Sequence, residues 1–108
     1  MNTDFIYLDA TEIAELIRTG KASSAEVVQA HLDRIEAVDS KTNAVVTLAD
    51  DPLDAARAAD EKLAAGAEVG PLHGVPCTVK DGFDTAGVLT QRGSPIFAGR
   101  IITTFRGE

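Results

Sequence analysis

One lysine in this 108-residue sequence is well placed for acid–base chemistry. Residues 75–80 predict a strand on which Pro76, Thr78 and Lys80 share one face. If the ammonium group is drawn inward, the loss of hydration lowers the pKa of a lysine by up to ~3–5 units, so the neutral amine can act as a base. The alternatives are a side chain that reaches back to water or one that pairs with Asp81. Spacing alone leaves these alternatives open.

The other residue types that carry catalysis or bind metals are scarce. His31 falls on the apolar stripe of a predicted helix, where we expect a histidine bonded to backbone, and His73 lies in a loop where local hydrogen bonds are expected to hold it. Cys77 has apolar neighbours, which favour a buried and inert thiol. These residues are too few for a zinc site, and the segment lacks the spacing of a phosphate-binding loop. We therefore expect no metal and no cofactor.

The serines are all explained by local structure. Ser23, Ser24 and Ser40 are expected at helix starts and turns, where capping accounts for them. Ser94 follows a glycine in a sequence typical of a turn. None of the four is therefore a candidate nucleophile.

Three helices and two strands are predicted to position these residues. Capping residues, apolar spacing and glycine stops predict helices from 9 to 20, from 23 to about 38 and from 51 to 65. Residues 44–48 are rich in β-branched side chains and predict a buried strand, to which residues 75–80 add a second. The third helix has a thin apolar face, made by Leu53, Ala56, Ala59 and Leu63, so it is expected to pack against a larger neighbour. A sheet of two strands is marginal without further strands.

Composition restricts the class of protein. A length of 108 residues suits one domain, and 44 % apolar residues with 25 % charged residues are typical of a folded globular chain. The formal charge of −7 disfavours binding to nucleic acid and to anionic membranes. The first nine residues do not resemble a signal peptide, and no apolar run has membrane length. With a single cysteine, these features lead us to expect a cytoplasmic protein.

Four segments together resemble the amidase signature family. They are SAEVVQAHLDRIEAVDSKTNAVVTLAD (24–50), PLHGVPCTVKD (71–81), FDTAG (83–87) and RGSP (92–95). The segments occur in the order usual for the family, and the resemblance extends to about residue 100. The GVPxxVKD core is long and unusual in composition, so a chance match together with the flanking segments is not expected.

The resemblance implies a fold and a mechanism. The fold is α/β, with residues 1–108 as a single, incomplete N-terminal part of a mixed-sheet α/β/α sandwich. In the family, a lysine, a serine held by a cis peptide bond and a nucleophilic serine hydrolyse carboxamides through an acyl-enzyme, and Lys80 matches that lysine. Asp81 is expected to hold the strand and its hydrogen bonds, while Gly74 and Pro76 are expected to shape the segment.

The family's two serines belong to a glycine- and serine-rich segment that this sequence lacks. We therefore expect the 108-residue chain to be inactive alone, with a small carboxamide as substrate only in a complete enzyme. The alternative is a non-catalytic assembly module that self-associates or complements a separately encoded remainder. One loop favours a stand-alone amidase over a subunit of the tRNA-dependent amidotransferase.

Three departures from the family pattern stand out. Cys77 replaces a more usual aromatic or aliphatic residue, which is expected to be a harmless change in packing. Gln91 replaces a common threonine or serine, which puts detail near the site in doubt. Residues 101–108 leave the family pattern altogether, which suggests a frameshift, an early stop or a cut chain.

Overall fold

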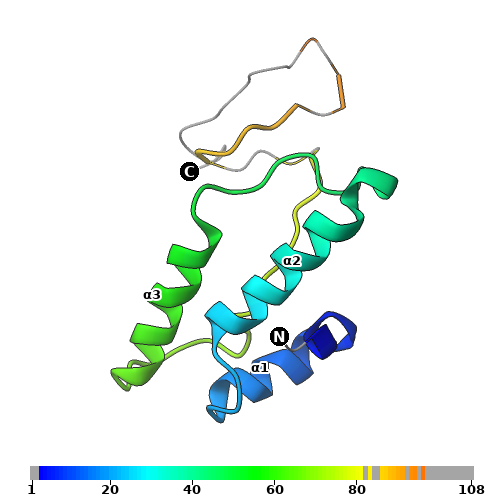
Figure 1. The fold of residues 1–108 in the computed structure, drawn as a ribbon. Helices are drawn as coiled ribbons and strands as arrows, with labels where there is room; N and C mark the ends of the chain where they lie inside the picture. Colours follow the sequence, from blue (N-terminus) through cyan, green and yellow to red (C-terminus); the bar gives the residue numbers. More distant parts are fainter. Residues whose placement is uncertain (1–2, 82, 84–85, 92, 95, 97–108) are drawn as a thin grey trace. The chain divides into compact units, whose positions relative to one another are not determined.

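Three α-helices follow a short 3-10 helix in the computed structural model, which describes residues 3–81, 83, 86–91, 93–94 and 96. The elements are η1 (Thr3–Tyr7), α1 (Ala10–Arg18), α2 (Ser24–Thr42) and α3 (Pro52–Ala64) (Figure 1). The chain divides into two compact units, one formed by Met1–Val46 with Asp51–Pro76 and the other by Thr47–Asp50 with Cys77–Glu108. All the helices just named belong to the first unit.

Helix α1 begins with the predicted capping box. The Asp9 carboxylate accepts a hydrogen bond from the backbone N–H of Glu12 at 2.8 Å, and the Glu12 carboxylate accepts one from the backbone N–H of Asp9 at 3.2 Å. The pKa of Asp9 is lowered, first by the Glu12 backbone N–H and then by the hydroxyl of Thr11, which also donates to its carboxylate. The start predicted for this helix is confirmed.

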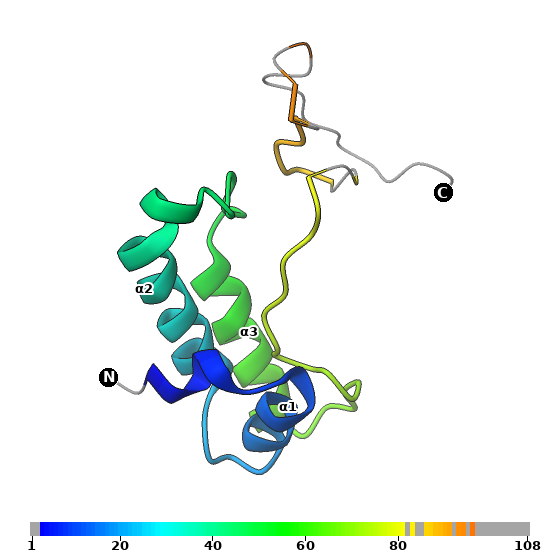
Figure 2. The same cartoon turned by 90° about the vertical axis from the view of Figure 1, so that its right-hand side faces the viewer.

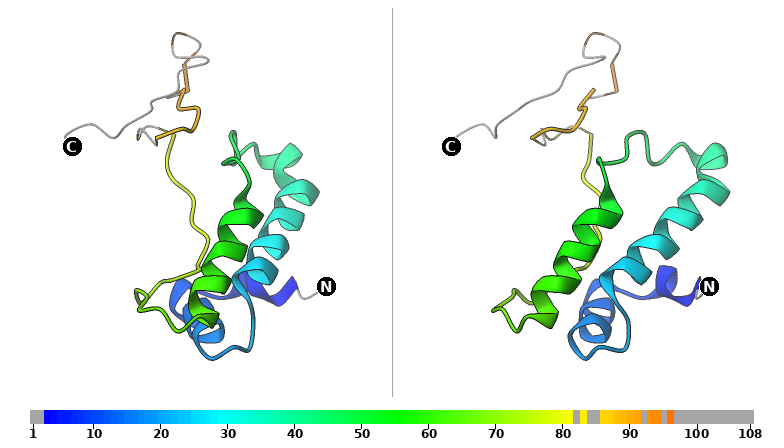
Figure 3. Two further views of the ribbon diagram at one scale, coloured as in Figure 1. Left: turned by 90° about the vertical axis from the view of Figure 1, so that its left-hand side faces the viewer. Right: turned by 60° about the vertical axis from the view of Figure 1, so that its left-hand side comes forward.

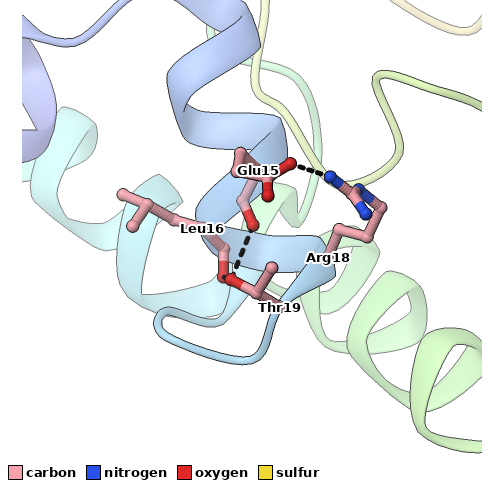
Figure 4. A network of polar contacts seen from close by, with 4 residues as sticks. All are labelled: Glu15, Leu16, Arg18 and Thr19. Carbon is pink, nitrogen blue, oxygen red and sulfur yellow. Dashed lines mark hydrogen bonds and ion pairs between the residues drawn. The ribbon is translucent and has the colours of Figure 1, made fainter.

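Side chains also form hydrogen bonds and an ion pair at the C-terminal end of α1 (Figure 4). The Thr19 hydroxyl donates to the carbonyl oxygen of Glu15 at 2.8 Å, one turn earlier in the helix. Arg18 forms an exposed ion pair with the Glu15 carboxylate. Such a pair contributes only about 0–1 kcal/mol, so packing rather than this pair must hold α1 in place.

Helix α2 begins as predicted but is longer than expected. Ser23 and Glu26 form a second capping box, with the Ser23 hydroxyl accepting from the Glu26 N–H at 3.0 Å. The helix continues to Thr42 and ends at Asn43, whose φ of 50° lies in the left-handed region that asparagine tolerates. The additional turn holds the next segment as well, because the Asp39 carboxylate accepts from the Val45 N–H at 2.9 Å.

Helix α3 has the predicted bounds to within one residue, but the residue that caps it does so with its backbone and not with its side chain. Asp51 is the N-cap residue with a φ of 47°, and its side chain makes no capping hydrogen bond. Its carbonyl oxygen instead accepts from the N–H groups of Asp54 and Ala55 at 3.1 and 3.2 Å. Gly66 follows the helix with a φ of 76°, as expected of a glycine stop.

The helices of the first unit pack around one small apolar core. Helices α2 and α3 lie side by side and run in opposite directions, while α1 lies near the start of α2 (Figures 2 and 3). Helix α2 also contacts η1. The buried core consists of Phe5, Ile13, Ile17, Ala22, Val27 and Ala30, with Leu8, Leu16, Leu63 and Val75 packed against it. The thin face predicted for α3 therefore finds its neighbour in α2.

Neither predicted strand forms among the described residues. Residues 44–48 and 75–80 are extended but belong to no sheet, and Val46 and Leu48 are 62 % and 52 % exposed. The two predicted strands are thus not seen in the part of the chain that the structure describes. The physical reason is that a strand needs a partner for its backbone groups, and the sequence pattern shows only that a segment is suited to such pairing.

Two hydrogen-bonded turns occur among the described residues of the second unit. The Phe83 N–H donates to the carbonyl oxygen of Lys80 at 3.0 Å, and the Ser94 N–H donates to that of Gln91 at 3.1 Å. The turn predicted at Ser94 is confirmed. The departure predicted at residues 101–108 lies outside the described residues. In the described part of the chain, no helix combines the length and apolar character required to cross a bilayer.

Candidate active site

Lys80 is exposed at the end of an extended segment. Its carbonyl oxygen closes the turn to Phe83, while its side chain faces solvent. Of the placements that the spacing leaves open, the structure shows the side chain reaching water rather than drawn inward. No ion pair among the described residues includes Lys80, so the proposed pairing with Asp81 is not seen either.

Asp81 binds backbone rather than its lysine neighbour. Its two carboxylate oxygens accept hydrogen bonds from the N–H of Gln91 at 3.1 Å and from that of Gly93 at 3.3 Å. The two bonds tie the residue that follows Lys80 to the turn that precedes Ser94. This geometry fits the hydrogen-bonding role expected of Asp81, whose part in catalysis remains a prediction.

Gly74 lies where a larger residue would not fit. Its φ is 83°, and a Cβ atom there would lie 3.2 Å from the Cβ and 3.3 Å from the hydroxyl oxygen of Ser24. The side chain of Ile17 would be 3.4 Å away. The backbone conformation strongly favours glycine, and a Cβ atom would in addition make a tight contact that Ser24 could relieve only by shifting. Pro76, two residues on, is half-buried.

Ser24 and Asp60 form a contact that sequence analysis missed. The Asp60 carboxylate, on α3, accepts from the backbone N–H groups of Ser24 at 2.7 Å and Ala25 at 3.0 Å, at the start of α2. The buried hydroxyl of Ser24 donates to the carbonyl oxygen of Gly74 at 2.6 Å. Ser24 is thus not a capping residue, as the sequence suggested, but a buried link. An acidic residue in the middle of a helix gives no signal of such a role.

Both histidines bind backbone, His31 as predicted and His73 through a partner in α3 rather than through the local hydrogen bonds expected within its loop. The Nδ1 atom of His31 lies 2.8 Å from the carbonyl oxygen of Val27, one turn earlier in α2. The Nε2 atom of His73 lies 2.8 Å from the carbonyl oxygen of Ala59 in α3, which fixes the loop before Gly74. Within the ranges that the structure describes, no three metal-ligating side chains come together.

Cys77 is exposed, so the prediction of a buried thiol was wrong. Its apolar neighbours suggested burial, yet the extended segment that carries it has no covering strand or helix in the described part of the chain. Ser40 also differs from expectation, since it lies inside α2 rather than at a turn. Ser23 caps α2 as predicted.

Comparison with known proteins identifies the family. The model of the Amidase family matches residues 26–104, which include Gly74, Pro76, Lys80 and Asp81. The chain belongs to the amidase family. The sequence resemblance and the family match agree.

Relatives of this amidase-family chain include two kinds of named protein. One is a glutamyl-tRNA(Gln) amidotransferase subunit from Salinispora arenicola, which is 51 % identical over 98 residues, covering 90 % of this chain and 20 % of the relative. The same subunit from Acidothermus cellulolyticus is 48 % identical over 100 residues, covering 92 % and 20 %. An indoleacetamide hydrolase from Bradyrhizobium diazoefficiens is 47 % identical over 87 residues, covering 80 % and 17 %. The chain therefore spans about a fifth of the length of these relatives.

Proposed function

We propose that this chain contributes Lys80 to a site that cleaves the C–N bond of a carboxamide through an acyl-enzyme. The observation that carries the proposal is the family match, which includes the GVPxxVKD segment around Lys80. The roles of Lys80, Asp81, Gly74 and Pro76 come with the family resemblance. The geometry at Gly74 and Asp81 supports them, because both residues hold the backbone that flanks the lysine.

The lysine acts as a base in this proposal. A serine hydroxyl attacks the carbonyl carbon of the amide, and its proton passes through a bridging serine to the neutral amine of Lys80. The tetrahedral intermediate then expels ammonia or an amine, which takes up the same proton returned from Lys80 through the bridging serine, and the acyl group stays on the serine oxygen. Water repeats the attack and releases the acid. Backbone N–H groups that stabilise the oxyanion complete such a site.

A neutral lysine requires a drier environment than Lys80 has in this structure. We propose that residues 44–48 and 75–80 join the mixed sheet of the α/β/α sandwich once further strands are present. The apolar side chains that they expose support this, since Val46, Leu48 and Val79 are 62 %, 52 % and 56 % exposed. Pairing would cover these side chains and remove water from Lys80, which lowers the pKa of a lysine.

The nucleophile must come from outside these 108 residues. Ser23 caps α2, Ser24 is buried, Ser40 lies within α2 and Ser94 lies in a turn. None belongs to the glycine- and serine-rich segment of the family. We therefore propose that the chain is inactive in isolation. Loss of the nucleophile typically costs orders of magnitude in rate.

The names of the relatives suggest two kinds of acceptor for the acyl-enzyme chemistry. The hydrolase relative supports release of the acid to water, and the amidotransferase relatives support a subunit that acts with partners on an amide donor. Because the chain is 51 % identical to the Salinispora protein, we consider an amidotransferase subunit alongside the stand-alone amidase that the sequence led us to expect. Indoleacetamide and glutamine, tested as alternative carboxamides, separate the two.

The test uses a hybrid enzyme, in which the whole 108-residue chain replaces the matching fifth of the Salinispora arenicola relative. We expect the hybrid enzyme to release ammonia from a carboxamide and Lys80→Ala to reduce kcat by about 10²–10⁴-fold, the range for loss of a general base. Lys21→Ala, at an exposed lysine in the loop after α1, is the matched control. Activity that survives Lys80→Ala at the level of the control would overturn the proposal.

A further inference from the structure

The first turn of α2 is tied to two other segments through a single residue. Ser24 is 2 % exposed, and its polar groups face different neighbours. Its backbone N–H donates to the Asp60 carboxylate in α3 at 2.7 Å, and its hydroxyl donates to the Gly74 carbonyl oxygen at 2.6 Å. The start of α2, the middle of α3 and the segment before Lys80 therefore meet at one buried serine.

Two side chains, not one, accept hydrogen bonds from the N–H groups at the start of α2. The Ser23 hydroxyl already accepts from the third N–H of α2, on Glu26. Asp60 accepts from the first and second N–H groups, on Ser24 and Ala25. A carboxylate at this end of a helix is further stabilised by the helix dipole. The site thus combines a cap within α2 with a charged link to another helix.

The same loop is held on both sides of Gly74. His73 binds the carbonyl oxygen of Ala59 at 2.8 Å, next to Asp60 in α3. On the other side, Val75 packs against the apolar core, and its N–H donates to the Leu72 carbonyl oxygen at 3.2 Å. These contacts on both sides of Gly74 restrain the segment from sliding along the direction of the chain.

This restraint matters for Lys80, which lies six residues further along the chain. In a strand, side chains alternate between the two faces, so a slip of one residue moves every side chain to the opposite face. An anchor at Gly74 sets the register with which residues 75–80 enter a sheet. The face that Lys80 presents depends on that register.

We propose that Ser24 and Asp60 are positioning residues for Lys80: the Ser24–Gly74 hydrogen bond, with Ser24 held by Asp60, fixes the register of residues 75–80. This inference rests on the proposed function, because it concerns the delivery of the same lysine. Neither residue is expected to touch substrate. Their loss changes how often Lys80 is correctly placed, not the chemistry that it performs.

The contribution of the Ser24 hydroxyl can be measured by comparing two variants whose side chains have nearly the same shape. Thr retains the hydroxyl and Val replaces it with a methyl group, so Ser24→Thr and Ser24→Val add similar bulk to the buried site. In the hybrid enzyme, with kcat expressed per active site by titration with an acylating agent, we expect Ser24→Val to turn over at least about tenfold more slowly than Ser24→Thr, the factor for 1.4 kcal/mol. KM is expected to be equal for the two. A merely structural role would lower the number of active sites without changing kcat per site.

Asp60→Asn provides an independent arm if the Ser24 variants fail to fold. It is expected to lower kcat per site with KM unchanged, whereas Asp54→Asn, on the exposed side of the same helix, is expected to match the unsubstituted hybrid enzyme. In the 108-residue chain itself, amide hydrogen exchange at Val75 is expected to be faster in Asp60→Asn than in Asp54→Asn.

The outcomes separate the two proposals. Survival of activity in Lys80→Ala overturns the proposed function. If Lys80→Ala abolishes activity while Ser24→Val equals Ser24→Thr and Asp60→Asn equals Asp54→Asn per active site, the proposed function stands and the positioning role is overturned.

Discussion

The hydroxyl of Ser24 donates a hydrogen bond of 2.6 Å to the carbonyl oxygen of Gly74, a residue 50 positions further along the chain. This contact joins the start of α2 to the segment that leads to Lys80. It also explains a glycine in the GVP motif, because a Cβ atom at residue 74 would lie within 3.3 Å of both side-chain atoms of Ser24. The glycine of this motif therefore also serves the packing of the segment against Ser24.

Replacing Gly74 with alanine is expected to cost more than the same change at another glycine with positive φ. Gly74→Ala adds an unfavourable backbone conformation of about 1–2 kcal/mol and a contact with Ser24 of about 1–3 kcal/mol. Gly66→Ala, with a φ of 76° and no atom within 4 Å of the added Cβ, incurs only the first cost. Urea denaturation measures both. Equal losses for the two variants would show that the contact with Ser24 is unimportant.

Asp60 is expected to contribute more to stability than an exposed acid on the same helix. Asp60→Asn weakens two hydrogen bonds to the start of α2 and should lower the free energy of unfolding by about 1.5–3 kcal/mol. Asp54→Asn breaks an exposed ion pair with Arg57 and should cost less than about 1 kcal/mol. Denaturation midpoints of the two variants test this, and a reversed order contradicts it.

Protonation of Asp9 is expected to loosen the start of α1 at low pH. The Glu12 backbone N–H and the Thr11 hydroxyl stabilise the carboxylate, so the pKa of Asp9 in the folded chain lies below its usual 3.8. For a lowered pKa, the stabilisation is present above the unfolded value and is lost as pH falls through the folded value. Titration of the Asp9 carboxyl carbon by NMR measures this. A midpoint at or above 3.8 in the folded chain contradicts the structure.

The thiol of Cys77 is expected to react freely in the native chain. It is exposed, and access rather than unfolding should limit its reaction with a disulfide reagent such as DTNB. At one pH, the rate should be close to that of the chain in urea. Strong protection without denaturant would show that residues around Cys77 are covered in solution. In the hybrid enzyme, by contrast, protection is expected if residues 75–80 join the sheet.

The sequence predicted the elements whose signals are local. Capping boxes at Asp9 and Ser23 require only residues three positions apart, and both predicted helix starts are confirmed. The contact of His31 with the carbonyl oxygen of Val27, one turn earlier, follows from its place on a helix. These features depend on near neighbours, which the sequence itself supplies.

Features that depend on distant partners were not predicted correctly. The two expected strands lack partners in the described part of the chain, so Cys77 is exposed rather than buried. The link from Asp60 to Ser24 joins residues 36 positions apart on two helices, and no pattern within either helix indicates it. The resemblance to the amidase family singled out Lys80, and its catalytic role stays a proposal.

In the proposed reaction Lys80 relays a proton while the attacking oxygen comes from outside residues 1–108, and trapping of an acyl-enzyme, detected by mass spectrometry, is the critical experiment. The hybrid enzyme is treated with a reactive acyl donor, quenched in acid and digested, and the mass of every peptide is compared with untreated enzyme. We predict an acyl group on a serine outside residues 1–108, its loss in Lys80→Ala, and no adduct on the isolated 108-residue chain. An acyl group on a side chain of the isolated chain, formed faster than in the Lys80→Ala chain, would contradict the account.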